Sequence, residues 1–262
     1  MTKSPLAGVG VLVTRPAQQA GVLMNAIEAS GGKAIAFPVI EISPRSPQDI
    51  EADIATLGEP DIVIYVSSNA VEHGLAWTSK GAIAAVGPAT AAAIEAAARI
   101  VDIRPASGYD SESLLAEPAL KDVDGKTVRI VRGSSGRELL ADTLRARGAT
   151  VDYLPVYERR LPSHSAAEVE TLAGHWQAGD IDVTTVMSVE SLRNLIVLIP
   201  DSCHQALAET PLVTPAARVL KEAQESLPGC PVSLATGPSA NEMVSTIAAI
   251  SIPEHHKSGQ NS

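Results

Sequence analysis

Two distant segments of the chain carry the same unit, a strand followed by a loop, a helix and a second strand. The later copy, residues 128–160, begins with an apolar run typical of a buried strand and continues through a glycine-containing loop into an amphipathic helix. Gly148 is placed to end that helix, because a left-handed C-terminal cap costs glycine little. A repeat this long predicts two related domains rather than a solenoid, whose repeats are shorter. Without a gap, Val11, Val13, Arg15, Leu23, Ile27, Gly31 and Pro38 match Val128, Ile130, Arg132, Leu140, Leu144, Gly148 and Pro155.

Strands and helices are predicted to alternate along the whole chain. This alternation indicates an α/β protein whose parallel sheets carry helices on both faces. Pro38 and Pro155 lie inside the second strand of each repeat, and we expect them to make the end of that strand an edge or a crossover. The predicted strands are residues 9–13, 34–42, 61–66, 82–86, 101–104, 128–131, 151–157, 181–187 and 232–235.

Two polar, proline-containing segments, residues 43–47 and 159–163, read as linkers and leave two domain layouts open. In the preferred layout, residues 1–40 plus 163–262 form domain one and residues 43–160 form domain two, with linkers at about 38–46 and 155–163. The segments near 35–42 and 152–159 would then lie side by side. The alternative is two consecutive halves that divide near residue 122.

The composition argues against several classes of protein. A formal net charge of −10 is unlike that of a duplex nucleic-acid binder. The alanine-rich stretch 82–98 contains Pro88 and Glu95 and is not a membrane span, and the first residues do not form a secretory signal. Cys203 and Cys230 lie outside any CxxC pattern; a disulfide between them stays open, but a reducing compartment is the simpler interpretation. The six histidines lack metal-ligand spacing, so we expect a cytoplasmic protein without a metal.

Polar loops at the carboxyl ends of the predicted strands mark a candidate binding edge. Each loop is expected to open a helix, whose free N–H groups and partial positive charge can bind a carboxylate or phosphate. The plainer interpretation of each serine or threonine is a helix cap. Arg15 and Arg132 either bind an anion or pin their loops through salt bridges, and Tyr157 either donates a proton or packs. The loop residues are Ser67, Ser68, Asn69, Gly87, Thr90, Arg132, Gly133, Ser134, Gly136, Ser188 and Thr214.

Several stretches together resemble the uroporphyrinogen-III synthase family. They are VLVTRPAQQAGVLMNAIEASGGKAIAFPVIEI, IYVSSNAVEHG, AAVGPATAAAIE, YDSESLLAEPAL and IVRGSSGRELLADTLRARGATVDYLPVYERRLP, which fall within the first 162 residues. Later, VMSVESLRNL and LVTPAARVLKEA look like the family's second serine and threonine loops. Thr214 begins Thr-Pro-Ala-Ala where the family usually has Ser-Pro followed by threonine, so this loop departs from the family pattern.

The resemblance implies two flavodoxin-like α/β domains joined by a two-stranded ladder. It also implies the reaction: linear hydroxymethylbilane loses water, the terminal pyrrole ring inverts through a spiro intermediate, and the macrocycle closes as uroporphyrinogen III. No cofactor or metal is implied. A monomer is expected, with the enzyme that supplies the substrate as a further partner and no nucleic acid or membrane. Few catalytic side chains are needed, because the protein mainly holds a conformation and helps hydroxide to leave.

By the same resemblance, Tyr157 assists the loss of hydroxide. The loop residues between Ser67 and Gly136 would bind the substrate from domain two, and Arg15, Ser188 and Thr214 would bind it from domain one. Two rival hypotheses remain. One is a non-catalytic, two-domain binding protein for a small anion, and the other is a regulatory protein that senses a tetrapyrrole.

Overall fold

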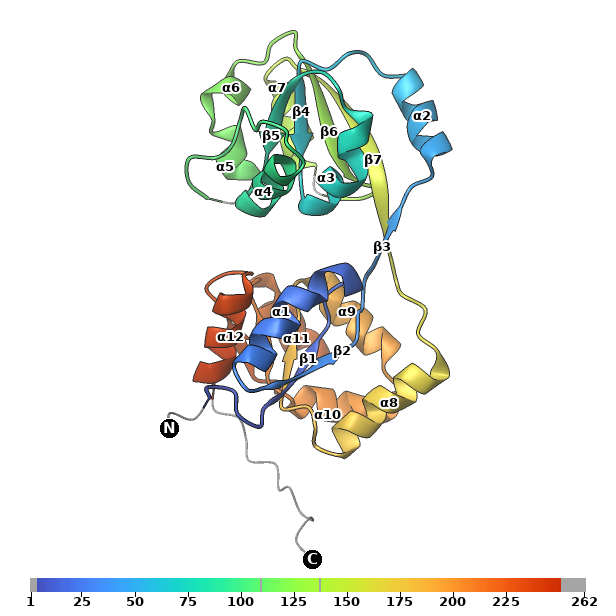
Figure 1. Ribbon diagram of the computed structural model, residues 1–262, viewed down its shortest axis with the longest axis vertical. Coiled ribbons are helices and arrows are strands. Elements are labelled where there is room, and N and C mark those ends of the chain that lie inside the picture. The colour runs from blue at the N-terminus through green and yellow to red at the C-terminus, as the bar shows by residue number, and fades with distance from the viewer. Residues whose placement is uncertain (1–3, 109, 137, 251–262) are drawn as a thin grey trace, which may run out of the picture. The chain divides into compact units, whose positions relative to one another are not determined.

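The computed structural model describes residues 4–108, 110–136 and 138–250. It divides the chain into two compact units, which we call unit 1 (Met1–Glu41 with Leu161–Ser262) and unit 2 (Ile42–Arg160). Each unit contains one five-stranded sheet with helices packed around it (Figure 1). The predicted α/β class is therefore confirmed. The sequence after Pro253 predicts disorder, and these residues lie outside the part of the chain that the structure describes.

Unit 1 is built on a sheet with the strand order β10-β9-β8-β1-β2, and its neighbouring strands pair in parallel. One face of α1 buries Leu23 and Ile27 against the same core as Met243 and Ile247 of α12. The strands are β1 (Gly10–Val13), β2 (Lys33–Ala36), β8 (Val183–Thr185), β9 (Leu212–Thr214) and β10 (Val232–Leu234). The helices are α1 (Ala17–Ala29), α8 (Ala166–Gln177), α9 (Val189–Leu198), η2 (Asp201–Cys203), α10 (His204–Glu209), α11 (Arg218–Ser226) and α12 (Ala240–Ala249).

Unit 2 has a sheet with the strand order β3-β7-β6-β4-β5. Its core joins the buried face of α7, with Leu140 and Leu144, to Val128 and Ile130 of the central strand. The strands are β3 (Glu41–Pro44), β4 (Ile62–Tyr65), β5 (Ala82–Ala85), β6 (Thr127–Gly133) and β7 (Thr150–Arg160). The helices are α2 (Pro47–Ala55), α3 (Ser68–Gly74), η1 (Leu75–Trp77), α4 (Pro88–Ala96), α5 (Ser111–Leu115), α6 (Pro118–Lys121) and α7 (Leu139–Ala146).

The internal repeat is visible in the backbone of both units. The first repeat forms β1, α1 and β2, and the second forms β6, α7 and β7. Gly31 and Gly148 follow the two equivalent helices and have φ values of +85° and +87°. These are the left-handed conformations that glycine tolerates best, so the predicted helix ends are confirmed.

The predicted strand 34–42 is wrong, because the chain breaks at Pro38 into two strands of different sheets. Residues up to Ala36 pair with β1, whereas β3 lies beside β7. Two backbone bonds extend past β2, from Phe37 N–H to the Val13 carbonyl at 3.0 Å and from Val39 N–H to the Thr14 carbonyl at 3.2 Å. Pro38 lies between the two donors, at the edge of this sheet, where a proline is tolerated. Of the segment expected beside residues 152–159, only its end in β3 lies there.

The predicted linkers are shorter than expected. Residues 43–44 belong to β3, and Ser46 caps α2, a helix that the sequence analysis missed, with Pro47 at its first position. At the other crossing β7 runs on to Arg160. Pro155 is accommodated by a bulge, because Arg132 pairs with Pro155 and Gly133 with Tyr157, which skips Val156. The predicted strand 101–104 is only an isolated bridge at Ile103, and α8 was also missed.

Cys203 and Cys230 are free thiols, so the disulfide left open above is not formed. Burial raises the pKa of the Cys230 thiol to about 11. At pH 8 we expect its thiolate population, and hence its rate of alkylation by iodoacetamide, to be roughly 100-fold below that of a thiol with a pKa near 9. The rate should increase with pH until about pH 11. Alkylation of a Cys203→Ser protein, followed by mass spectrometry with and without denaturant, tests this; equal rates in the two conditions would contradict it.

Candidate functional site

The carboxyl ends of the parallel strands in unit 2 meet at one edge of its sheet. β5, β4, β6 and β7 are neighbours in that order. Ser67 follows β4, Gly87 follows β5, Gly133 ends β6 and Tyr157 lies in the last part of β7. The predicted residues of this unit therefore lie along one edge, where α/β sheets bind ligands. Figure 1 shows the strands β5, β4, β6 and β7 that end there.

Tyr157 packs closely against Gly133 and Ser67 at this edge. Its side chain is buried, and its phenol oxygen lies 3.3 Å from the hydroxyl of Ser67. A Cβ atom added to Gly133 would stand 2.8 Å from Cε2 of Tyr157, so the ring rests directly on the glycine backbone. The backbone N–H of Ser134 donates to the Tyr157 carbonyl at 2.9 Å. Both the ring and the backbone of Tyr157 are thus held in place.

Helix capping is observed for two of the predicted serines. The Ser67 hydroxyl accepts from the N–H of Ala70 at 3.2 Å at the start of α3, and Ser188 accepts from Ser191 at 3.1 Å at the start of α9. Gly87 precedes α4 without a side-chain cap, and Pro88 occupies the first helical position. The remaining predicted residues of these loops differ in exposure: Ser68 is exposed, whereas Asn69 and Thr90 are buried.

Arg132 shows the salt bridge that was one of its two interpretations. Its side chain is 8% exposed and donates from Nη1 to Glu138 Oε1 at 3.0 Å, while its guanidinium lies 4.7 Å from the centre of the Tyr153 ring. Hydrogen bonds from Tyr153 and Arg132 lower the pKa of Glu138. A Cβ atom on Gly136 would lie 2.6 Å from Arg132 Nη2, so this loop passes directly over the guanidinium.

Two predictions about the Arg132 loop need correction. Arg132 and Gly133 belong to β6 rather than to the loop, and α7 starts only at Leu139 without a side-chain cap. The ladder to β7 continues through these residues, which keeps them in the strand. A surface pocket of about 320 Å³ lies beside the loop. Its lining includes the predicted Arg132, Gly133, Ser134 and Gly136 and also Glu138 and Tyr153, which the sequence analysis missed.

In unit 1 the predicted residues lie at the ends of three neighbouring strands: Arg15 follows β1, Ser188 follows β8 and Thr214 is the last residue of β9. Arg15 donates from Nη2 to the Pro238 carbonyl at 2.6 Å rather than to a carboxylate, and its Nε atom is buried with no hydrogen-bond partner in the described residues. Burial lowers the pKa of the Arg15 guanidinium, which remains charged at neutral pH. Thr214 is fully buried, and its hydroxyl accepts from Ala216 N–H at 3.2 Å. It therefore closes a turn and does not open α11, contrary to the prediction.

The contact at Pro238 was missed, although the sequence carries a signal for it. The sequence pair Gly237-Pro238 resembles Gly87-Pro88 and likewise marks a helix start, although Pro88 is the first residue of α4 and Pro238 precedes Ser239, the cap of α12. Ser239 and Glu242 form a capping box at the start of α12. A carbonyl that precedes such a helix is a suitable acceptor for a neighbouring arginine, which explains the position of Arg15.

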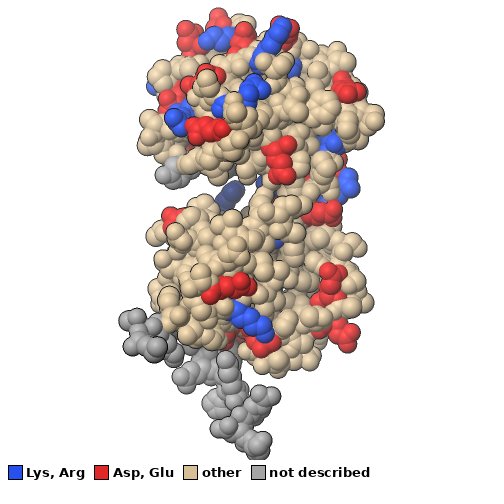
Figure 2. Space-filling model, viewed as in Figure 1, with Lys and Arg blue, Asp and Glu red and all other residues tan. Residues whose placement is uncertain are grey.

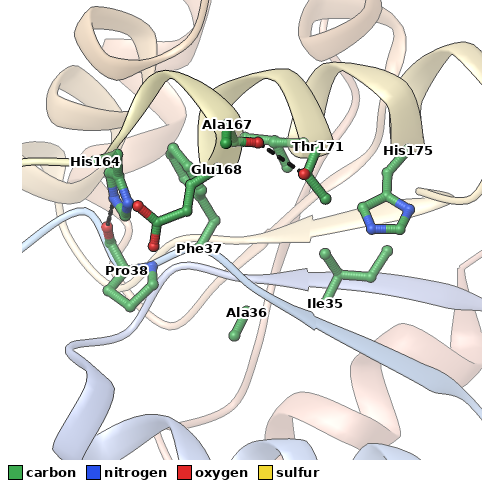
Figure 3. A pocket seen from close by; sticks show the side chains of 10 residues that line it. Ile35, Ala36, Phe37, Pro38, His164, Ala167, Glu168, Thr171 and His175 are labelled. Carbon is green, nitrogen blue, oxygen red and sulfur yellow. Dashed lines mark hydrogen bonds between the residues drawn. The ribbon is translucent and has the colours of Figure 1, made fainter.

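A groove of about 270 Å³ in unit 1 contains none of the predicted residues (Figure 3). It lies between the segment from Ile35 to Pro38 and one face of α8. The His164 ring stacks on Phe37 with centroids 4.1 Å apart, and its Nε2 lies 2.7 Å from the Pro38 carbonyl oxygen. At the other end, His175 Nδ1 lies 2.8 Å from Asp180 Oδ2. The His164 contacts attach the chain after β2 to the segment that leads into α8, and the His175 contact joins α8 to the segment after it.

Charged side chains of both signs are spread over the face of the protein that Figure 2 shows. Acidic and basic side chains lie near one another on the visible face, separated by uncharged residues (Figure 2). Within residues 4–108, 110–136 and 138–250, no three His, Cys, Asp or Glu side chains gather as metal ligands would. His255 and His256 lie outside these residues, so the search for metal ligands does not include them.

In the same described residues no helix has the length and apolar character needed to span a bilayer.

Comparison with known proteins identifies the family. The model of the family described as uroporphyrinogen-III synthase HemD matches residues 21–245. The chain belongs to this family. The protein named uroporphyrinogen-III synthase from Escherichia coli (strain K12) is 35% identical over 201 residues, which cover 73% of this chain and 80% of the relative. The resemblance seen in the sequence motifs is confirmed.

Two solved structures of uroporphyrinogen-III synthases share the fold. The enzyme from Helicobacter pylori 26695 aligns with a TM-score of 0.61 and 14% identity, over 90% of this chain and 97% of that one. A mutant from the extreme thermophile Thermus thermophilus aligns with a TM-score of 0.56 and 19% identity, over 89% and 95%. The match to the uroporphyrinogen-III synthase family includes Ser67, Arg132 and Tyr157, whereas Arg15 precedes the matched range.

Proposed function

We propose that this protein is a uroporphyrinogen-III synthase that converts linear hydroxymethylbilane into uroporphyrinogen III. The observation that carries the proposal is the convergence of Tyr157, Ser67 and Gly133 at the carboxyl edge of the sheet, in a chain of this family. The reaction is a cyclisation with loss of water and no change of oxidation state. It therefore needs a leaving-group donor and a shaped, carboxylate-binding surface.

Tyr157 is the proposed donor to the leaving hydroxyl. The C–O bond of the terminal hydroxymethyl group breaks as the pyrrole nitrogen lone pair forms an azafulvene, and the departing oxygen receives a hydrogen bond from the phenol. The azafulvene carbon then bonds to the substituted carbon of the terminal ring and gives the spiro intermediate. The bond from that carbon to the methylene bridge of the neighbouring ring breaks, which leaves a second azafulvene on the neighbouring ring. The methylene carbon of this azafulvene bonds to the free α-carbon of the terminal ring, so that the ring is inverted when the macrocycle closes. The proton released when the last ring regains aromaticity balances the hydroxide, so that water leaves overall.

The remaining predicted residues are proposed to bind the eight carboxylates of the substrate. Backbone N–H groups at the starts of α4 and α9 attract carboxylates locally, and this local field matters more than the net charge of −10. The Nη1 atom of Arg132 is already occupied by Glu138 and is therefore not available to a substrate carboxylate. The proposed substrate-binding residues are Ser67, Ser68, Asn69, Gly87, Thr90, Arg132, Gly133, Ser134 and Gly136 in unit 2, and Arg15, Ser188 and Thr214 in unit 1.

The test uses freshly prepared hydroxymethylbilane and separates the product isomers by chromatography after oxidation to porphyrins. The uncatalysed cyclisation gives the isomer with the terminal ring unflipped, so the purified protein should produce isomer III at a rate proportional to its concentration. Production of the unflipped isomer alone, at the rate seen without protein, would overturn the proposal. Tight binding of uroporphyrinogen III without turnover would instead favour the tetrapyrrole-sensing hypothesis.

We further propose that the protein works as a cytoplasmic monomer and receives its substrate from the enzyme that makes it. The two free thiols support a reducing compartment. Light scattering coupled to size-exclusion chromatography should give a mass near 27.1 kDa. A mass twice as large, independent of concentration, would contradict the monomer.

A further inference from the structure

We propose that Ser67 is a positioning residue for Tyr157, to whose phenol oxygen it donates its hydroxyl proton. The Tyr157 proton is then left to point toward the substrate. This inference rests on the proposed function, since it concerns the same reaction. It gives Ser67 a role that acts through Tyr157 and that differs from direct contact with a substrate carboxylate.

The hydrogen bonds of Ser67 restrict the direction of its proton to two arrangements. Its Oγ atom accepts from the N–H of Ala70 at 3.2 Å, and Tyr157 Oη lies 3.3 Å from the same atom. An N–H group can only donate, so one lone pair of Ser67 is occupied by the helix cap. The hydroxyl proton is free to rotate, and the phenol oxygen is the acceptor within reach. Ser67 can therefore satisfy both contacts at once only as an acceptor from Ala70 and a donor to Tyr157, or as an acceptor from both.

Because the Tyr157 ring is held by its packing, the arrangement that Ser67 adopts decides the orientation of the phenolic proton. The Tyr157 ring is 3% exposed, lies on Gly133 and is flanked by the ring of His73, with centroids 6.1 Å apart. A ring held in this way fixes the position of its oxygen, and a phenolic proton prefers the plane of the ring, where it has two orientations. When Ser67 donates on one side, the Tyr157 proton takes the other. A phenol that accepts a hydrogen bond is also a stronger donor, because linked hydrogen bonds polarise one another.

The experiment uses a nearly isosteric pair at position 67. Asparagine and aspartate cap helices about as well as serine does, so Ser67→Asn and Ser67→Asp both keep the bond to Ala70. Only asparagine has an N–H group to donate to Tyr157, since an ionised carboxylate can only accept. At saturating hydroxymethylbilane, Ser67→Ala should lower kcat roughly 3- to 10-fold, the effect of one ordinary hydrogen bond. Ser67→Asn should recover at least half of the loss, and Ser67→Asp should fall below Ser67→Ala.

Two measurements separate positioning from helix stability. Ser46 caps α2 through Asp49 in the same way, outside the proposed site, so Ser46→Ala should cost similar thermal stability without lowering kcat. The 13Cζ resonance of Tyr157 reports the hydrogen bonds that the phenol oxygen accepts. It should shift in Ser67→Ala and Ser67→Asp and return toward the wild-type position in Ser67→Asn.

The outcomes that overturn the inference are specific. Equal kcat values for Ser67→Asn and Ser67→Asp, or an Ser67→Ala protein with a higher KM and an unchanged kcat, would reduce Ser67 to a cap or a substrate contact. If wild-type protein forms no isomer III, the proposed function fails. The 13Cζ series would still decide in that case whether Ser67 donates to Tyr157.

Discussion

Replacement of Tyr157 by phenylalanine is expected to lower kcat by roughly 30- to 1000-fold, nearer the lower value, while the affinity for product changes little. A hydrogen bond to a group that gains charge only in the transition state is worth on the order of 2–4 kcal/mol. The lower value is expected because positioning of the substrate supplies much of the rate acceleration. The bond contributes mainly in the transition state, so its loss appears in kcat rather than in binding.

Tyr157→Phe is expected to remove the phenol oxygen without disturbing the packing of the ring or the backbone. The ring of Tyr157 is held by Gly133 and its backbone carbonyl accepts from Ser134, and neither contact involves the phenol oxygen. Tyr65→Phe is the matched control, because Tyr65 is also a buried tyrosine of the same sheet, but its hydroxyl bonds to Thr78. Tyr65→Phe should cost stability and leave kcat unchanged. A folded Tyr157→Phe protein with wild-type kcat would make Tyr157 a packing residue and leave catalysis to backbone groups.

Gly10→Ala is expected to destabilise unit 1 by more than about 3 kcal/mol, a large effect for a single methyl group. A Cβ atom on Gly10 would stand 1.7 Å from the Asp180 carbonyl oxygen, a backbone atom that cannot turn away. Two hydrogen bonds hold Gly10 against the segment that precedes β8. Gly10 N–H donates to Asp182 Oδ2 at 2.7 Å, and Asp182 N–H donates to the Gly10 carbonyl at 2.8 Å. The methyl group must therefore push β1 away from the chain that leads into β8.

Gly21→Ala is expected to stabilise unit 1, in contrast to Gly10→Ala. Gly21 lies inside α1 with no atom within 4 Å of an added Cβ, so alanine should stabilise the helix by up to about 1 kcal/mol. Thermal and urea unfolding followed by circular dichroism test both variants. Similar midpoints for Gly10→Ala and the wild-type protein would show that this strand approach is not as close as described.

The candidate site shows what kind of information a sequence carries. Ser67 and Ser188 were recognisable as caps because a cap depends on residues within three positions in the chain. The bond between Ser67 and Tyr157 joins residues 90 positions apart and could not be read from local pattern. A salt bridge of Arg132 was one of its two predicted interpretations, but its partner Glu138 was missed, because the path of the loop between β6 and α7 is not given by a helix or strand period.

The α/β class, the internal repeat and the helix ends at Gly31 and Gly148 could be predicted from the sequence, because they depend on hydropathy periods and on the backbone conformation of single residues. Family membership likewise followed from local motifs. Only the tertiary structure decided that the apolar run around Pro38 divides between two sheets, since an apolar strand is compatible with any partner that buries it. The same holds for the position of Tyr157 on Gly133 beside Ser67: packing of three separate strands and loops brings these residues together, and no local preference specifies it.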